Sequence, residues 1–172
     1  MIVFWSAIIG IVIMSLTAIF SIRLISKKEL IVVINLSTEL GNYFKGREYR
    51  HFVAPFDVVL IDEDKINKIQ PDLTVICGKE GLGEQNYTGI PTLVVEVLFP
   101  STASNDFIRK MGLYMKVGVK EYWIISPQNK TVQIFTLNED SLYSEPVMYS
   151  KEDMVKSVVF FDLKIELRNI FI

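Results

Sequence analysis

The chain has 172 residues, the size of one ordinary domain, and this length can bury a hydrophobic core without disulfide bonds. Its single cysteine, Cys77, excludes an internal disulfide, and its place in the apolar run "LTVICG" leads us to expect a buried structural thiol. The net charge of −2 and the isoelectric point near 5.5 exclude the basic excess of a protein that coats nucleic acid. They do not exclude an enzyme with a local basic groove. His51 is the only histidine, so we expect it to be structural or at the surface.

The first segment is an uncharged run at residues 2–22. A helix of 21 residues would be about 30 Å long, which matches the hydrocarbon core of a bilayer. Arg23, Lys27 and Lys28 follow the run, so the positive-inside rule places the remainder in the cytoplasm. A buried helix or a pair of apolar strands is the alternative. We therefore expect residues 1–28 to contain a transmembrane helix and residues 29–172 to form a cytoplasmic domain tethered to the membrane.

The next segment, residues 29–44, has helical periodicity. Leu36, Leu40, Tyr43 and Phe44 recur at helical spacing, which predicts a surface helix that ends near Gly46. After it, "REYRHFVAPFDVVLI" and "QPDLTVICG" are rich in residues that favour strands. The polar stretch "DEDKINK" separates them, so we expect a hairpin or a meander.

The remaining elements alternate between strands and one helix. "GKEGLGEQNYTGIP" reads as a mobile glycine-rich connection, and the strand "PTLVVEVLFPST" follows it. A helix is predicted from Ala103 to Val117, with Ser101 or Thr102 as its N-cap and Gly118 as its stop. "KEYWIIS", "TVQIFTL" and "LYSEPVMYS" are further strands, and "VVFFDLKIELRNIFI" closes the domain. This order indicates an α/β (α+β) fold.

One strand carries a carboxylate in its middle. Glu96 interrupts "VVEVL", and burying a lone ionised carboxylate costs several kcal/mol unless a partner, a proton or a metal accompanies it. Asp72 begins the strand "LTVIC" after a proline, where it could also be a simple turn residue. Two carboxylates on neighbouring strands supply the hard oxygen ligands that Mg²⁺ or Mn²⁺ prefers, while water and substrate phosphate fill the other positions.

The predicted helix after Glu96 carries three polar positions on one face. Asp106, Lys110 and Tyr114 are spaced at i, i+4 and i+8. Lys110 could stabilise charge on a phosphate or orient the attacking water, a combination suited to phosphodiester hydrolysis. In the alternative, Asp106 and Lys110 form a surface ion pair and Tyr114 is a core or rim residue.

Three motifs of the chain resemble the Uma2 family, formerly called DUF820, of the PD-(D/E)xK restriction-endonuclease-like superfamily. They are "APFDVVL", "QPDLTVICG" and "PTLVVEVLFPSTASNDFIRKMGLYMKVGVKEYWIISPQNKTVQIF". The resemblance covers residues 36–172. It implies a mixed central sheet flanked by helices and a metal-dependent nuclease site. Asp72 matches the aspartate of the PD motif and Glu96 the acidic residue of the (D/E)xK motif, so both are expected to hold Mg²⁺ or Mn²⁺. Asp57 matches a recurrent acidic position and is a further candidate ligand or hydrogen-bond acceptor.

The chain departs from the family pattern at three places. The motif lysine should stand at Leu98, and the resemblance implies that Lys110 takes over its role. Phe99 replaces the serine of the usual "SPST", which removes a hydroxyl beside the site. The strand that usually precedes the first helix is replaced by the apolar segment.

These departures leave two accounts of the whole protein open. In the first, the chain is a membrane-anchored, Mg²⁺-dependent endonuclease that hydrolyses DNA. In the second, a truncated gene encodes an inactive remnant of the nuclease fold, or a membrane-associated binding module. For an active nuclease that cuts both strands of DNA, we expect a homodimer.

Overall fold

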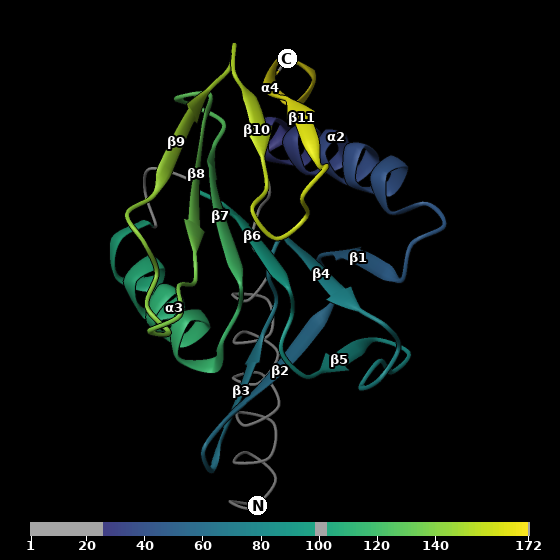
Figure 1. Cartoon of the computed structure of the whole chain (residues 1–172), viewed down its shortest axis with the longest axis vertical. Coiled ribbons are helices and arrows are strands. Elements are labelled where there is room, and N and C mark those ends of the chain that lie inside the picture. The colour runs from purple at the N-terminus through teal and green to yellow at the C-terminus, as the bar shows by residue number, and fades with distance from the viewer. Residues whose placement is uncertain (1–25, 99–102, 172) are drawn as a thin grey trace, which may run out of the picture.

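The computed structural model describes residues 26–98 and 103–171. The described chain builds a six-stranded sheet in the order β1-β4-β6-β7-β8-β9 (Figure 1). The bounds are Tyr49–Val53 for β1, Leu73–Cys77 for β4, Leu93–Val97 for β6, Glu121–Ser126 for β7, Thr131–Thr136 for β8 and Val147–Ser150 for β9. β6 and β7 are parallel, and the other neighbouring strands are antiparallel. The expected mixed central sheet of an α+β fold is therefore confirmed.

The helices follow the predicted positions closely. α2 covers Lys27–Phe44, α3 covers Ala103–Val117, and the short α4 covers Leu167–Ile170. α2 begins with a capping box, in which the amide of Glu29 donates to Ser26 Oγ at 3.3 Å and the amide of Ser26 donates to Glu29 Oε2 at 2.8 Å. The cap explains why α2 starts two residues before the predicted position. The predicted caps of α3, Ser101 and Thr102, lie outside the described residues.

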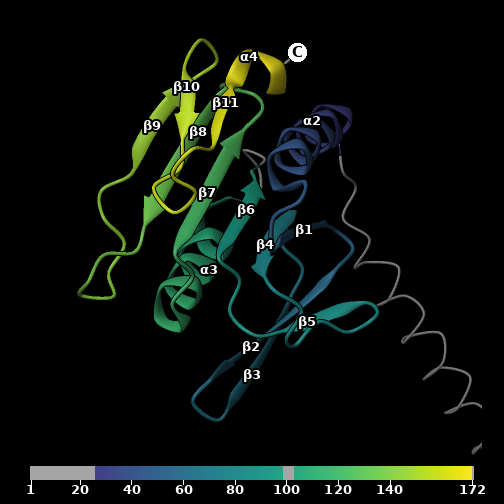
Figure 2. The same cartoon turned by 45° about the vertical axis from the view of Figure 1, so that its right-hand side comes forward.

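Two hydrophobic cores lie on the two faces of the sheet, because successive side chains of a strand point to opposite faces. Val75 of β4 and Val95 of β6 pack toward α2, α4 and the two-stranded ribbon of β10 (Met154–Lys156) and β11 (Lys164–Glu166). Ile76 and Val94, one residue along, pack toward α3 and the smaller sheet β3-β2-β5. Figure 2 shows α2 beside β1 and β4, and α3 near the ends of β6 and β7. In β4 and β6, odd-numbered residues therefore face α2 and even-numbered residues face α3.

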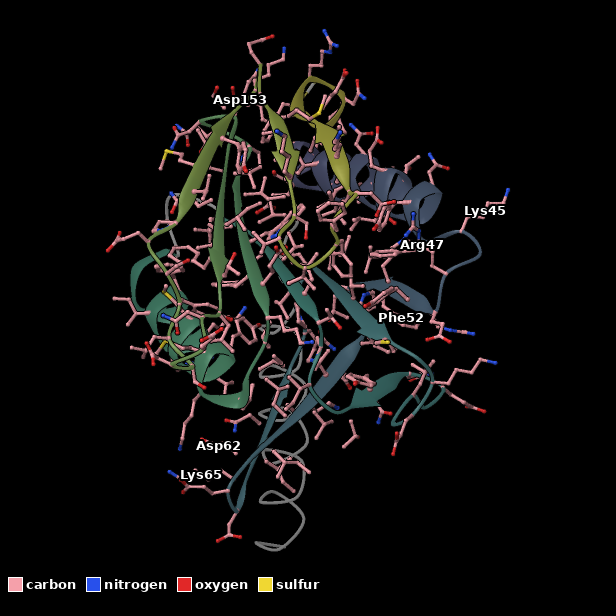
Figure 3. All side chains as sticks on the ribbon, viewed as in Figure 1. Lys45, Arg47, Phe52, Asp62, Lys65 and Asp153 are labelled. Atoms are coloured by element: carbon pink, nitrogen blue, oxygen red, sulfur yellow. The ribbon has the colours of Figure 1, made fainter. Side chains whose placement is uncertain are left out.

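The strand pairing at the start of the domain differs from the sequence expectation. The polar stretch "DEDKINK" is not a linker, because β2 (Asp57–Asp62) and β3 (Lys65–Ile69) form a hairpin, and all of β3 except Ile69 lies in this stretch. β1 instead pairs with β4. The hairpin extends away from the main sheet in both views, with Asp62 and Lys65 near its outer end (Figure 3). Because β3 is largely exposed, its polar sequence lacks the apolar signal of a buried strand.

The structure adds a strand to one further segment and corrects the burial of Cys77. The glycine-rich connection contains β5 (Asn86–Thr88), which pairs in parallel with β2 and buries Tyr87. Gly81 has a φ of +77°, a left-handed conformation that favours glycine, so this connection folds into a specific turn. Cys77 is exposed rather than buried, because it is the last residue of β4, at the end of the packed part of the strand.

The predicted membrane span at residues 2–22, and with it the expected apolar N-terminal helix, lies outside the described residues. Among residues 26–98 and 103–171, we find no helix that combines the length and the apolar composition needed to cross a bilayer.

Candidate functional site

The sheet brings Asp72 and Glu96 to the same place. β4 and β6 are antiparallel neighbours in which Leu73 pairs with Val95, and one further step of this register sets Asp72 opposite Glu96. Both residues are buried, with whole-residue exposures of 7% for Asp72 and 3% for Glu96. Directly opposed residues of an antiparallel pair have Cβ atoms about 4.5–5.5 Å apart. The expected pair of carboxylates on neighbouring strands is therefore present.

Helix α3 supplies the partners of Glu96. The ammonium of Lys110 lies 3.0 Å from Oε1 and 3.0 Å from Oε2, and Tyr114 donates from its hydroxyl to Oε1 at 2.8 Å. Lys110 and Tyr114 are four residues apart, so they lie one above the other on the helix face that covers β6. Tyr114 is a core residue with no exposed surface, and its hydroxyl is hydrogen-bonded to Glu96 of the candidate site.

The electrostatic balance at Glu96 has opposing causes. Burial raises the pKa of the Glu96 carboxyl, and the neighbouring Asp72 raises it further, while Lys110 and the hydrogen bond from Tyr114 lower it. The net direction is upward, because removing a carboxylate from water disfavours its charged form. An additional cation between the two carboxylates would relieve their repulsion. The pair is thus suited to bind either a proton or a metal.

Asp72 is held by the backbone of the neighbouring strand. The amide of Val97 donates to Asp72 Oδ2 at 2.7 Å, and the carbonyl of Asp72 accepts from the amide of Ala54 at 3.2 Å. The first of these is a charge-assisted bond, the stronger class of hydrogen bond. Asp72 therefore does more than follow a proline in a turn, because its carboxylate is oriented across the sheet beside Glu96.

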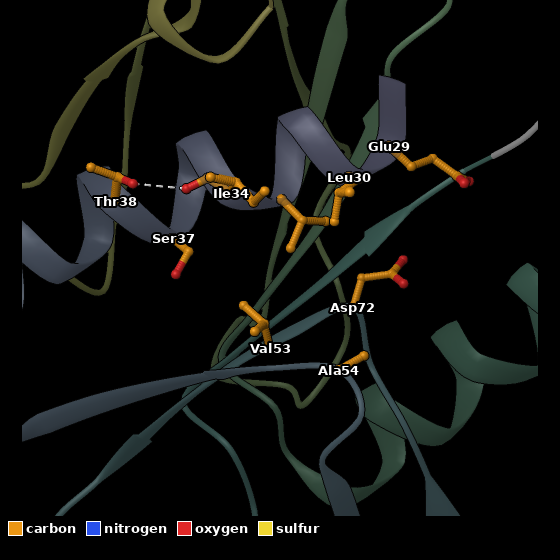
Figure 4. A pocket seen from close by; sticks show the side chains of 9 residues that line it. Glu29, Leu30, Ile34, Ser37, Thr38, Val53, Ala54 and Asp72 are labelled. Carbon is orange, nitrogen blue, oxygen red and sulfur yellow. Dashed lines mark hydrogen bonds between the residues drawn. The ribbon is translucent and has the colours of Figure 1, made fainter. Parts of the chain in front are cut away.

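A cavity of about 220 Å³ adjoins Asp72, between α2 and the end of β1. Its wall is mostly apolar, and Leu30, Ile34 and Val53 are its partly exposed members. Glu29 lines the cavity together with Asp72, and Figure 4 shows both carboxylates pointing to the same side of it. Asp72 therefore lies beside both Glu96 and this cavity.

The remaining predicted site residues lie elsewhere or cannot be placed. Asp57, on β2, accepts a hydrogen bond from Gln70 at 2.7 Å and forms an ion pair with Lys68 at 2.6 Å, within the β2–β3 hairpin. These partners lower the pKa of the Asp57 carboxyl. They support its structural role as a hydrogen-bond acceptor. Asp106 lies within α3, but its side chain is outside the described residues.

The donor set fits a divalent ion of the Mg²⁺ type. Mg²⁺ is often held by one or two carboxylates, with water and substrate phosphate as its other ligands, and Asp72 and Glu96 provide such a pair. Within the described ranges, no group of three or more His, Cys, Asp or Glu residues is arranged to hold a metal. Most of the coordination sphere would therefore come from water and from a phosphate.

A model of the Uma2 family, described as "Putative restriction endonuclease", matches residues 25–168. The chain belongs to the Uma2 family. A solved structure from Anabaena variabilis, titled as a putative nuclease belonging to DUF820, has the same fold, with a TM-score of 0.71 and 16% identity. The comparison covers 87% of this chain and 83% of that one.

A relative from Synechocystis, named "Uncharacterized protein slr1290", is 26% identical over 116 residues. The match covers 67% of this chain but only 60% of that relative's length. The fold and the family membership therefore extend over most of this chain.

The cation that reaches Glu96 comes from α3 and not from β6. Leu98, the position at which the resemblance led us to expect a lysine, is half-buried and packs against the core beneath α3. Lys110 brings its ammonium to Glu96 from the helix instead. Phe99, the second departure, lies outside the described residues.

Glu29 is the site-lining residue that sequence reasoning missed. It is 3% exposed and stands in the cavity wall with Asp72, although the two are 43 positions apart in the chain. The available signal was local, because Ser26 and Glu29 have the spacing of a capping box. That signal predicts where a helix begins, and it does not predict which strand the helix will cover.

Proposed function

We propose that this Uma2 protein is a Mg²⁺-dependent endonuclease that hydrolyses phosphodiester bonds of DNA, with Asp72 and Glu96 as metal ligands and Lys110 as the cation of the reaction. The observation that carries the proposal is the pair of buried carboxylates of Asp72, just before β4, and Glu96, on β6, with an ammonium 3.0 Å from Glu96. The family description and the fold support the nuclease class. The choice of DNA and of the metal is our inference from this chemistry.

Each residue has a role that follows from its contacts. Asp72 and Glu96 would hold the ion, and the amide of Val97 fixes the carboxylate of Asp72 for that purpose. Bound Mg²⁺ would supply a Lewis acid that stabilises charge on the phosphate and lowers the pKa of water. Tyr114 fixes the orientation of the Glu96 carboxylate by donating to Oε1. Lys110 would bind a non-bridging phosphate oxygen and stabilise the charge that develops there.

Cleavage of supercoiled plasmid DNA by the purified full-length chain tests this function. We expect nicking in the presence of Mg²⁺ or Mn²⁺ and none in the presence of a chelator. Glu96→Gln should lower the rate by about 100-fold or more, since it removes a ligand charge. Lys110→Met should lower it by at least about 100-fold through loss of the phosphate contact.

Lys116→Met is the matched control for Lys110→Met. It removes the same charge from the same helix, but Lys116 is exposed and pairs with Asp62 and Glu63 on the β2–β3 hairpin. It should cleave at the rate of the unmodified chain. Equal activity of the unmodified chain and of Glu96→Gln would refute the catalytic assignment. A folded chain without any cleavage would instead favour the inactive nuclease fold.

A further inference from the structure

Lys110 occupies the acceptor atoms that a metal would need. Its ammonium is equidistant, at 3.0 Å, from the two oxygens of Glu96. Tyr114 adds a second hydrogen bond to Oε1. Among the described residues, Oε1 accepts from Lys110 and Tyr114 and Oε2 accepts from Lys110, so both oxygens of this carboxylate are engaged by side chains of α3.

A divalent ion and this ammonium require the same oxygens at different distances. Mg²⁺ binds carboxylate oxygens at about 2.0–2.1 Å, well inside the 3.0 Å separation of the ammonium. Two cations that share one buried carboxylate also repel each other, and burial weakens the screening of that repulsion. Full occupation of Glu96 by both cations in the present geometry is therefore unfavourable.

We propose that Lys110 is a built-in competitor of the divalent metal, which holds Glu96 in the metal-free protein and lowers the affinity of the site for the ion. The inference rests on the proposed function only in taking Asp72 and Glu96 to be metal ligands. In this inference, a metal ion that enters the site displaces the ammonium of Lys110 from Glu96. The displaced Lys110 is then able to reach a phosphate.

The side chains of the pair are exposed to different extents, which supports this direction of movement. The side chain of Lys110 is 16% exposed and that of Glu96 is 4% exposed. The Lys110 side chain extends from α3 on a flexible four-carbon stem and is partly exposed to solvent, whereas Glu96 is fixed within β6. When the contact breaks, the ammonium is therefore the group that moves.

Mn²⁺ titration of the full-length chain by calorimetry, without DNA, tests the competition. Lys110→Met should bind Mn²⁺ at least about tenfold more tightly than the unmodified chain, because the competing charge is gone. Lys110→Arg keeps the charge and should stay within about threefold of the unmodified chain. Lys116→Met should leave the affinity unchanged, and Glu96→Gln should abolish binding. Lys110→Gln should follow Lys110→Met and replaces it if the methionine variant does not fold.

Thermal unfolding gives a second measurement. Without metal, Lys110→Met should melt at a lower temperature, because Glu96 loses its counter-ion, and Mn²⁺ should raise its melting temperature more than that of the unmodified chain. Weaker or equal Mn²⁺ binding by Lys110→Met would overturn the proposal, since Lys110 would then help to arrange the ligand. Absence of binding in all variants would also overturn it. Failure to cleave DNA would not, because the measurement contains no substrate.

Discussion

Glu96 and Glu121 are buried carboxylates on the adjacent strands β6 and β7, and the kind of partner distinguishes them. In the described part of the chain, the donors to Glu121 are neutral: the indole of Trp123 at 2.9 Å, the hydroxyl of Ser157 and the amides of Val158 and Val159. Glu96 instead faces an ammonium and a second carboxylate. A carboxylate surrounded by neutral donors is held in place, whereas a carboxylate beside another one can recruit a cation.

His51 makes the stability of the protein depend on pH near neutrality. Burial lowers the pKa of His51 below 6.5, and its Nε2 lies 3.0 Å from the Ser37 hydroxyl on α2. The unfolded chain therefore binds more protons than the folded one just below pH 6.5. The contribution of His51 to stability is complete above the unfolded pKa and is lost as the pH falls through the lower folded pKa.

We therefore expect the free energy of unfolding to fall between about pH 7.5 and about pH 5.5 by a His51-dependent part. Urea unfolding of the unmodified chain and of His51→Gln, which stays neutral and can still hydrogen-bond Ser37, measures that part. Glu96 contributes with the opposite sign, because its pKa is raised, but it does so in both chains and cancels in the difference. Identical pH dependence of the two chains would contradict the prediction.

At the scale of elements, Glu121 fastens the turn after β10 to the start of β7. Its oxygens accept from the amides of Val158 and Val159 at 2.6 and 3.1 Å and from Ser157 Oγ, which in turn accepts from the amide of Phe160. The turn thereby places Phe160 in the core on the α2 face, edge-on to Phe44. One carboxylate thus sets where the chain returns to the sheet.

Glu121→Ala should lower the free energy of unfolding by about 3 kcal/mol, because several buried donors lose their acceptor at once. Urea unfolding of the full-length chain measures the loss. Glu166→Ala is the control: Glu166 pairs with Arg168, and both side chains are substantially exposed, so its removal should cost less than about 1 kcal/mol. Equal, small losses in the two variants would show that Glu121 does not fasten the turn.

The elements could be predicted from the sequence more reliably than their pairing. The periodicity of α2 and the boundaries of α3 were readable because each has an apolar face and each ends before or near a glycine. β3 was missed because its partner is a single strand of a projecting hairpin, so its sequence need not be apolar. The pairing of β1 with β4 depends on contacts between distant segments, which local patterns do not contain.

The same limit applies to the candidate site. The apolar context of Glu96 predicted a buried carboxylate, and the i, i+4 spacing of Lys110 and Tyr114 predicted a shared helix face. "KEYWIIS" presents the same signal as "VVEVL", yet its glutamate has a structural environment. Only the fold reveals whether the donors that reach a buried carboxylate are neutral or charged.

At the scale of the whole molecule, the two faces of the main sheet carry different kinds of residues. Glu96 lies on the face of β6 toward α3, and Asp72 stands just before β4, while the face toward α2 is an apolar core with Glu121 at its margin. The cavity beside Asp72 opens where α2 crosses the end of β1. The candidate site thus stands where α2 and α3 meet the sheet, and residues 2–22 end shortly before α2 in the sequence.

The uncharged run at residues 2–22 predicts that the full-length chain is found with membranes, and cell fractionation followed by an alkaline carbonate wash checks this. We expect the chain in the washed membrane pellet. Ile11→Lys with Met14→Lys should shift it to the soluble fraction, because each central lysine costs about 2.5–3.5 kcal/mol of insertion free energy. Leu142→Lys, a matched charge at an exposed leucine of the domain, should leave the distribution unchanged. Recovery of the intact unmodified chain wholly in the soluble fraction would contradict the span, since the apolar run would then have to be buried against protein.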